Sequence, residues 1–150
     1  MEMIDDSRNM LRDLLESQRF AVVASLNENQ PYCSLVAFVS SDDFRELFFV
    51  TPRYTRKYSN LKKKSRAAML IDNRSNKPSD IIKAVATTAI GKIRELKGSA
   101  RNSYIKKYLI KHPHMKEFAS SPSCSMLVMK VERYNLVSKF QNVLELDVPR

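Results

Sequence analysis

Apolar residues in the first third of the chain fall into three short runs separated by polar turns. The runs are FAVVASL (20–26), YCSLVAFV (32–39) and ELFFVT (46–51), and they are rich in the β-branched and aromatic residues that strands favour. The connections NENQP (27–31) and SSDDFR (40–45) consist largely of residues that favour turns. Because short turns join antiparallel neighbours, the pattern predicts a three-stranded meander that begins with a hairpin.

The rest of the chain repeats the strand pattern at longer spacings. Strands are predicted over 66–72, 81–96 and 124–140, and the tail 142–148 has the pattern of one more short strand. The segment NRSNKPSD (73–80) predicts a polar loop. Gly91 interrupts the run 81–96, which indicates a bulge or bend of the kind that barrels use.

Three segments have helical rather than strand spacing. Leu11, Leu14 and Leu15 recur at helical intervals in 4–18, a segment that begins with acidic and capping residues. A short basic helix is predicted over 55–64. An amphipathic helix is predicted over 99–111, and with the turn after it forms a helical insertion over about 99–119.

Strands that follow one another through short turns favour a mainly β fold over parallel βαβ units. We therefore predict one domain over residues 1–150, an antiparallel β-barrel with peripheral helices. A chain of this length can bury one real core. Glycine occurs only twice, which excludes the glycine-rich phosphate loops of Rossmann and P-loop proteins.

Charge adds a question about partners, because 26 Lys and Arg against 16 Asp and Glu give a formal net charge of +10. A surplus of this size attracts polyanions without specificity, although proteins can be basic for reasons unrelated to a ligand. The cysteines, Cys33 and Cys124, have no metal-binding spacing and are expected to be reduced and half-buried. With no apolar run long enough for a membrane span and no signal peptide, we expect a cytoplasmic protein.

The basic charge is concentrated in TPRYTRKYSNLKKKSR (51–66), between two predicted strands. Hydroxyls, cationic side chains and helix N-terminal amides are the donors that a phosphate monoester needs. Such donors stand where the strand ends and the helix begins, at Thr51, Thr55, Arg56 and Lys57, and Arg53 is a further candidate. The later basic residues cannot all face the same point, and we expect a solvated helix end at Lys62, Lys63, Lys64 and Arg66.

Other features are weaker signals. DNRSN (72–76) could donate to a ligand, but it has the composition of an ordinary Asx turn. His112 and His114 could ligate a metal or haem, yet no carboxylate or cysteine cluster accompanies them, so an exposed turn and no metal site are expected. Tyr54 and Tyr58 stand among basic residues and leave nucleic-acid binding open. No motif identifies catalytic residues.

Four blocks give the chain a resemblance to the FMN-binding split-barrel family typified by pyridoxamine 5′-phosphate oxidase. They are FAVVASLNENQPYCSLVAFV, LFFVTPRYTRKYSNL, SRAAMLID and ATTAIGKIREL, of which the second is the most specific, and the likeness runs from about Leu11 to Val148. The resemblance implies a six-stranded antiparallel Greek-key split barrel. It also implies a homodimer with FMN in two clefts between the subunits.

The resemblance further implies roles for particular residues. Arg56 and Lys57 would hold the FMN phosphate, with hydroxyls from Thr51 and Thr55. The isoalloxazine would lie along backbone groups of Ser34, Leu35, Val36 and Ala37. The DNRSN segment would face the cleft, which makes candidates of Asn73, Arg74, Ser75 and Asn76. The segment KFQN would stand near the partner's flavin, which adds Phe140, Gln141 and Asn142.

Two departures separate the chain from the classical oxidase. Ser34 and Val39 stand where that enzyme has an Arg and a Lys, and the tail NVLELDVPR (142–150) does not match its Trp- and Arg-containing signature. In the classical enzyme those residues hold the vitamin substrate. Pyridoxamine 5′-phosphate oxidase activity is therefore not expected.

We expect an FMN-binding flavoprotein, in which the flavin performs the electron chemistry of an oxidoreductase on an unknown small-molecule substrate. The alternative is a non-catalytic carrier or sensor of flavin, deazaflavin or haem, and FAD is a further alternative cofactor. A basic barrel that binds nucleic acid is the less favoured third hypothesis.

Overall fold

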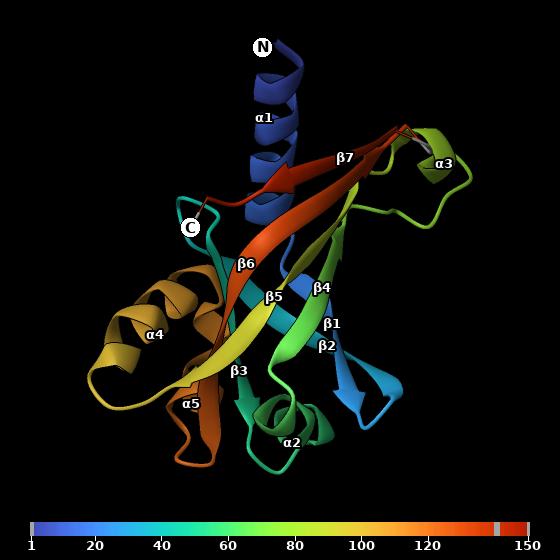
Figure 1. The fold of residues 1–150 in the computed structure, drawn as a ribbon. Coiled ribbons are helices and arrows are strands. Elements are labelled where there is room, and N and C mark those ends of the chain that lie inside the picture. Colours follow the sequence, from blue (N-terminus) through green and yellow to red (C-terminus); the bar gives the residue numbers. More distant parts are fainter. Residues whose placement is uncertain (1, 140–141, 150) are drawn as a thin grey trace.

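The strands build one sheet that closes on itself (Figure 1). The computed structural model describes residues 2–139 and 142–149. Within them the strands are β1 (Phe20–Asn27), β2 (Gln30–Ser40), β3 (Glu46–Pro52), β4 (Arg66–Asp72), β5 (Ala86–Leu96), β6 (Cys124–Ser138) and β7 (Asn142–Asp147). Their order is β3-β2-β1-β4-β5-β6-β7, and β3 also pairs with β6. That pairing closes six strands into a barrel and leaves β7 as an extension of β6, which confirms the predicted six-stranded antiparallel barrel.

The predicted strand at 81–96 starts too early. Residues 80–83 form the short helix α3 (Asp80–Lys83), and β5 begins only at Ala86. The Asp80 carboxylate accepts hydrogen bonds from the backbone N–H groups of Ser75, Asn76 and Lys77, which folds the loop back on the helix start. The apolar residues that suggested a strand, Ile81 and Ile82, are exposed.

The longer helices lie where they were predicted. They are α1 (Glu2–Ser17), α2 (Arg56–Lys63) and α4 (Ala100–Lys111), and a 3-10 turn (Pro113–Met115) and α5 (Lys116–Ser120) complete the insertion. α1 and α2 lie at opposite ends of the barrel, and α4 and α5 lie to one side of it (Figure 1). α1 contributes its leucines, among them Leu15, to the core.

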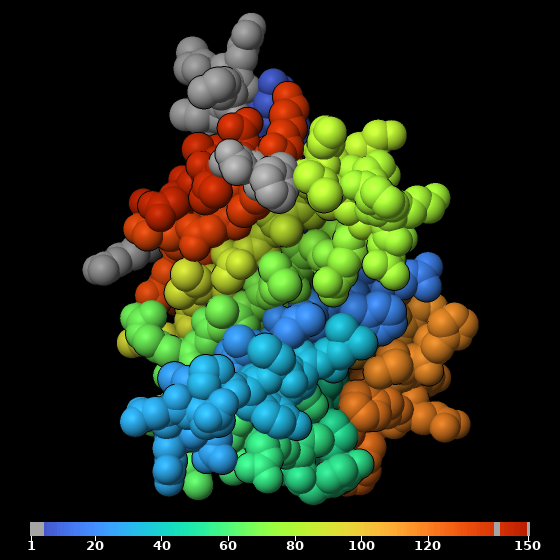
Figure 2. All heavy atoms as spheres, turned by 90° about the vertical axis from the view of Figure 1, so that its right-hand side faces the viewer, coloured from blue at the N-terminus to red at the C-terminus, as the bar shows by residue number. Residues whose placement is uncertain are grey.

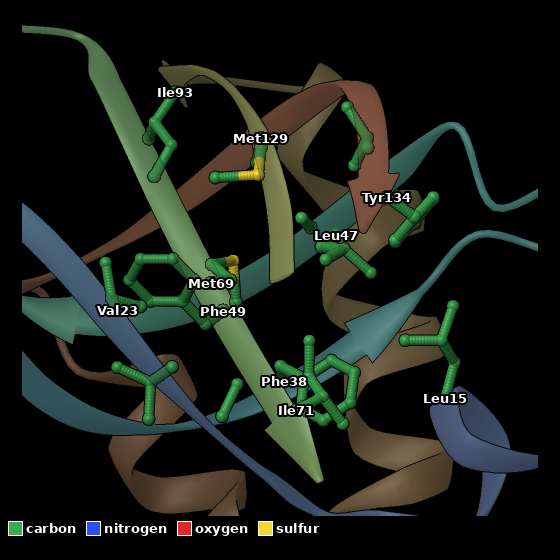
Figure 3. Packing of buried hydrophobic residues seen from close by; sticks show 14 of the residues in the cluster. Leu15, Val23, Phe38, Leu47, Phe49, Met69, Ile71, Ile93, Met129 and Tyr134 are labelled. Carbon is green, nitrogen blue, oxygen red and sulfur yellow. The ribbon is translucent and has the colours of Figure 1, made fainter. Parts of the chain in front are cut away.

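Two hydrophobic clusters meet at the barrel wall. The first fills the barrel and includes Phe38, Phe49 and Met129 (Figure 3). The second lies between the wall and α4–α5 and includes Phe48 and Tyr108. Successive side chains of a strand point to opposite faces, so β3 is buried on both sides, which explains its unbroken apolar run.

His112 contradicts the expectation of an exposed turn. It ends α4 and is only 6% exposed, because it lies beneath the second cluster and contacts the Tyr108 ring. Its Nε2 donates to the Phe38 carbonyl at 2.8 Å, and burial lowers its pKa. His112 therefore docks α4 on β2, whereas His114 in the next turn is exposed as expected.

Gly91 marks a bulge, as predicted, because the register between β5 and β6 shifts between Ile90 and Gly91. A Cβ on Gly91 would collide with the backbone carbonyl of Lys130. We expect Gly91→Ala to lower the free energy of unfolding by about 1–3 kcal/mol, as overpacking does. Urea denaturation measures this. Gly98→Ala is the control, because a Cβ on Gly98 would meet open space, so only the backbone strain of its positive φ, about 1 kcal/mol, is expected there. Equal effects of the two changes would contradict the collision.

Candidate cofactor site at the open edge of the barrel

The barrel wall is open between β2 and β3. Their ladder stops at Phe38 opposite Phe49, although β2 reaches back to Gln30 and β3 runs on to Pro52. Beyond that point, among residues 2–139 and 142–149, β2 pairs only with β1, and β3 only with β6. We call the side of β2 residues 33–37 that is turned away from β1 the open edge.

The open edge presents unpaired backbone groups. Phe38 N–H donates to Arg19 O at 3.2 Å, on the β1 side. Backbone groups alternate in direction along an antiparallel strand, so those of Cys33 and Leu35 point away from β1, toward the opening. Of the predicted residues 34–37, only Leu35 and Ala37 thus turn their backbone groups to the opening, while those of Ser34 and Val36 face β1.

The side chains of this segment divide between different surroundings. Val36 is buried in the barrel core, and Ala37 packs against the second cluster. Leu35 is 68% exposed on the outer face of the sheet. The Ser34 hydroxyl is buried and lacks a hydrogen-bond partner among the described residues, so it could serve a ligand at the open edge.

The first turn of α2 stands beside this opening. Thr55 is its N-cap: the hydroxyl accepts from Tyr58 N–H at 3.4 Å and donates to Pro52 O at 2.9 Å. Thr51 is buried at the end of β3, with its Oγ1 3.2 Å from Thr55 Oγ1. Lys57 Nζ donates to Thr51 Oγ1 at 3.1 Å. Thr51 thus contacts two other predicted phosphate ligands, Thr55 and Lys57.

Arg56 extends this cluster toward β2. Its guanidinium carbon lies 6.0 Å from the centroid of the Tyr32 ring. We call Thr51, Thr55, Arg56 and Lys57 the phosphate grip. The first turn of α2 contains no acidic residue, and partial burial lowers the pKa of Lys57. A bound dianion would raise this pKa again, because an opposite charge favours the ammonium form.

Three residues that the sequence did not single out help to place α2. Tyr32 lies under Arg56. Asn60, buried on the barrel side of α2, donates through Nδ2 to the buried Ser25 hydroxyl of β1 at 3.1 Å. The signal for Asn60 was a polar residue on the apolar face of a short amphipathic helix, next to Leu61.

Other candidates are engaged elsewhere. Arg53 donates to the carbonyls of Pro122 and Cys124 and to the Ser125 hydroxyl, so it ties the end of β3 to the start of β6. Asn142 is exposed at the start of β7, opposite Ser138. Phe140 and Gln141 lie outside the described residues.

The DNRSN loop lies at the far end of β4 from α2 and forms the turn that its composition predicted. Asn73 Oδ1 accepts from Val85 N–H at 2.7 Å, and the backbone and hydroxyl of Ser75 donate to Asp80. Asn76 adopts a positive φ of 62° in the same turn. Arg74 pairs with Asp72 at 3.0 Å. Two residues of this segment, Asp72 and Arg74, line a hollow of about 190 Å³ on the outer face together with Leu35.

The later basic residues are exposed, but most of them have partners. Lys62 pairs with Glu95 at 3.2 Å and Arg66 with Glu132 at 3.1 Å. Lys64 Nζ donates to Glu28 O at 2.8 Å. The expected solvated helix end is therefore held to the barrel at several points, and its charges point in different directions.

Within residues 2–139 and 142–149, no group of three or more His, Cys, Asp or Glu side chains could hold a metal ion. No helix in this part of the chain is long and apolar enough to cross a bilayer. Both cysteines are free, as expected, but Cys33 is exposed and Cys124 is buried instead of both being half-buried.

Known structures share this fold. A protein related to general stress protein 26 from Clostridium acetobutylicum, described as of the pyridoxinephosphate oxidase family, superposes with a TM-score of 0.73 at 18% identity and covers 96% of both chains. An FAD-binding protein from Mesorhizobium loti gives 0.69 at 13% identity, covering 86% of this chain and 90% of its own. A heme binding protein from Mycobacterium smegmatis gives 0.80 at 18% identity, covering 91% of this chain, which spans only 55% of that protein. At such identities these likenesses concern the fold.

No curated protein matches the sequence. The family model described as pyridoxamine 5′-phosphate oxidase matches residues 8–138, which include both the open edge and the phosphate grip. The chain therefore belongs to the pyridoxamine 5′-phosphate oxidase family of split-barrel proteins.

Proposed function

We propose that this protein binds FMN, with the phosphate in the phosphate grip and the ring along the open edge, and that it is a flavin-dependent oxidoreductase. The observation that carries the proposal is the contact of Thr51, Thr55 and Lys57 at the start of α2. They supply hydroxyl and ammonium donors where no carboxylate competes for them, next to strand groups that lack partners.

The parts of the site have separate tasks. Lys57 and Arg56 would offset the charge of the phosphate dianion, while the Thr51 and Thr55 hydroxyls would give directed hydrogen bonds after rotating from their present partners. The helix N-terminus adds positive potential at the same place. The backbone of Cys33 and Leu35 orients the polar edge of the ring. Bound FMN supplies the electron transfer itself.

A homodimer is part of this proposal. Phe20, Leu35 and Leu70 are 56%, 68% and 37% exposed. The register places Val22 opposite both Leu35 and Leu70, so these apolar side chains share one face of the sheet. Figure 2 views this side of the molecule, where β1, β2 and β4 form the surface. An exposed apolar face of this kind fits a second copy of the chain, which would close the cofactor site at the open edge.

We expect Leu70→Asp to convert the dimer to monomers, because it would place charge in the centre of this apolar face. Sedimentation equilibrium measures the mass. The matched control is Ile110→Asp, since Ile110 is 80% exposed on α4, away from this face. A Leu70→Asp protein of unchanged dimer mass would contradict the assignment of this face.

The test of the proposed function is the absorbance spectrum of the purified protein, before and after addition of FMN. We expect flavin bands at close to one FMN per chain, and mass spectrometry of the released ligand should identify FMN rather than FAD, deazaflavin or haem. Stopped-flow reduction by nicotinamide nucleotides then separates an oxidoreductase from a carrier, whose flavin no physiological donor would reduce.

A further inference from the structure

The carboxylate of Glu95 is nearly enclosed at the α2 end of the barrel, with 6% of its side chain exposed. It accepts hydrogen bonds from Ser125 Oγ at 2.6 Å, Tyr58 OH at 2.8 Å and Lys62 Nζ at 3.2 Å. Burial acts to raise the pKa of Glu95, but these donors outweigh it and hold the pKa below the usual value. Glu95 is therefore an anion at neutral pH.

These contacts join Glu95 to two segments that carry the phosphate grip: the helix α2 and the loop before it. Tyr58 and Lys62 are spaced i, i+4 and lie on one face of α2, directly after the grip residue Lys57. In the loop between the grip residues Thr51 and Thr55, Arg53 Nη1 donates at 3.1 Å to the Ser125 hydroxyl, which itself donates to Glu95. One carboxylate thus holds α2 directly and, through Ser125, the loop that precedes α2.

α2 depends on such anchoring. It has eight residues, RKYSNLKK, and a helix this short is not stable by itself. It contains four basic residues and no acidic one, so the carboxylate that pairs with it must come from another element. Among the described residues, Glu95 makes no hydrogen bond or ion pair with Thr51, Thr55, Arg56 or Lys57. Its influence on the grip is indirect.

We propose that Glu95 is a positioning residue for the phosphate of the bound flavin. By holding α2 and the preceding segment in one orientation, it makes the donors of the phosphate grip converge on one point. This inference rests on the proposed binding of FMN.

The test compares the affinity for FMN with the affinity for riboflavin, which lacks the phosphate. Glu95→Gln keeps the size of the side chain but removes the charge that Lys62 pairs with. We expect this variant to bind FMN roughly tenfold more weakly, the loss that follows from weakening one charged hydrogen bond. Riboflavin affinity should be unchanged, because riboflavin does not use the grip.

Glu46→Gln is the matched control. Glu46 also accepts from a tyrosine and a cation, Tyr104 OH at 2.7 Å and Arg94 Nη2 at 3.0 Å, but its partners lie on α4 and β5, not α2. This variant should bind both flavins as the wild type does. If Glu95→Gln does not fold, Tyr58→Phe removes one of the donors to Glu95 and allows the same comparison.

A second measurement separates positioning from a general structural role. Substitutions that act on the same interaction do not have additive effects on binding free energy. If Glu95 acts by positioning the grip, the effect of Glu95→Gln on FMN affinity should therefore shrink in a Lys57→Ala background. Equal weakening of FMN and riboflavin binding, an unchanged FMN affinity, or full additivity with Lys57→Ala would each overturn the inference. A wild-type protein that does not prefer FMN to riboflavin would instead overturn the phosphate grip itself.

Discussion

Replacing Lys57 with alanine is expected to weaken FMN binding by about 1.5–3 kcal/mol, or roughly 10- to 150-fold, the range for hydrogen bonds to charged groups. Lys57 Nζ already contacts Thr51 Oγ1 at 3.1 Å, so its ammonium is directed to the place where the phosphate would sit. Its partial burial strengthens the interaction, because the local dielectric constant is below that of water. Fluorescence titration with FMN measures the loss.

Lys63→Ala is the control for this prediction. Lys63 belongs to the same helix and has the same charge, but it is exposed in the last turn of α2. FMN affinity should be unchanged in this variant. If the basic segment instead bound nucleic acid, both changes would weaken salt-dependent binding to generic DNA by similar amounts. Equal FMN affinity of Lys57→Ala and the wild type would refute the placement of the phosphate.

Phe49→Ala is expected to lower the free energy of unfolding by about 3–5 kcal/mol, as truncations of buried aromatic residues do. Phe49 is fully buried in the barrel and lies opposite Phe38 in the last pair of the β2–β3 ladder. The loss is a large part of a typical total stability of about 5–15 kcal/mol. Chemical denaturation measures it.

Phe48→Ala allows a matched comparison from the opposite face of β3. Phe48 is equally buried, and its ring meets Tyr104 edge to face at 5.0 Å. Both variants should lose similar stability. Of the two, only Phe49 stands in the pair at which β2 and β3 separate. Under conditions in which both variants fold, FMN affinity should therefore fall in Phe49→Ala and not in Phe48→Ala. A matching fall in Phe48→Ala would contradict a special role for the barrel interior at the opening.

The fold could be predicted from the sequence to a large extent because local patterns and tertiary packing agree. Alternation, turn residues and Gly91 located the barrel strands and the bulge. The prediction failed at 81–83, where the two isoleucines suggested a strand, because the deciding contact is made by the Asp80 side chain with the backbone of the preceding loop. Such a contact has no periodic signal.

The candidate site was predictable only where its residues are close in sequence. Thr51, Thr55 and Lys57 lie within one strand-to-helix turn, so their spacing in the sequence was sufficient to predict that they lie close together. The Glu95 network joins residues up to 72 positions apart, Arg53 and Ser125, and His112 is buried through a contact with a residue 74 positions away. Pairings at such distances depend on how the barrel closes, which composition and spacing do not specify.

The central claim is that the positive charge at the start of α2 is directed to one phosphate group. Isothermal titration of the wild-type protein with FMN and with riboflavin tests it most directly. We predict one FMN per chain and at least tenfold weaker binding of riboflavin, as expected when charged hydrogen bonds to the phosphate are lost. Equal affinities for the two flavins, or no binding of FMN, would contradict it.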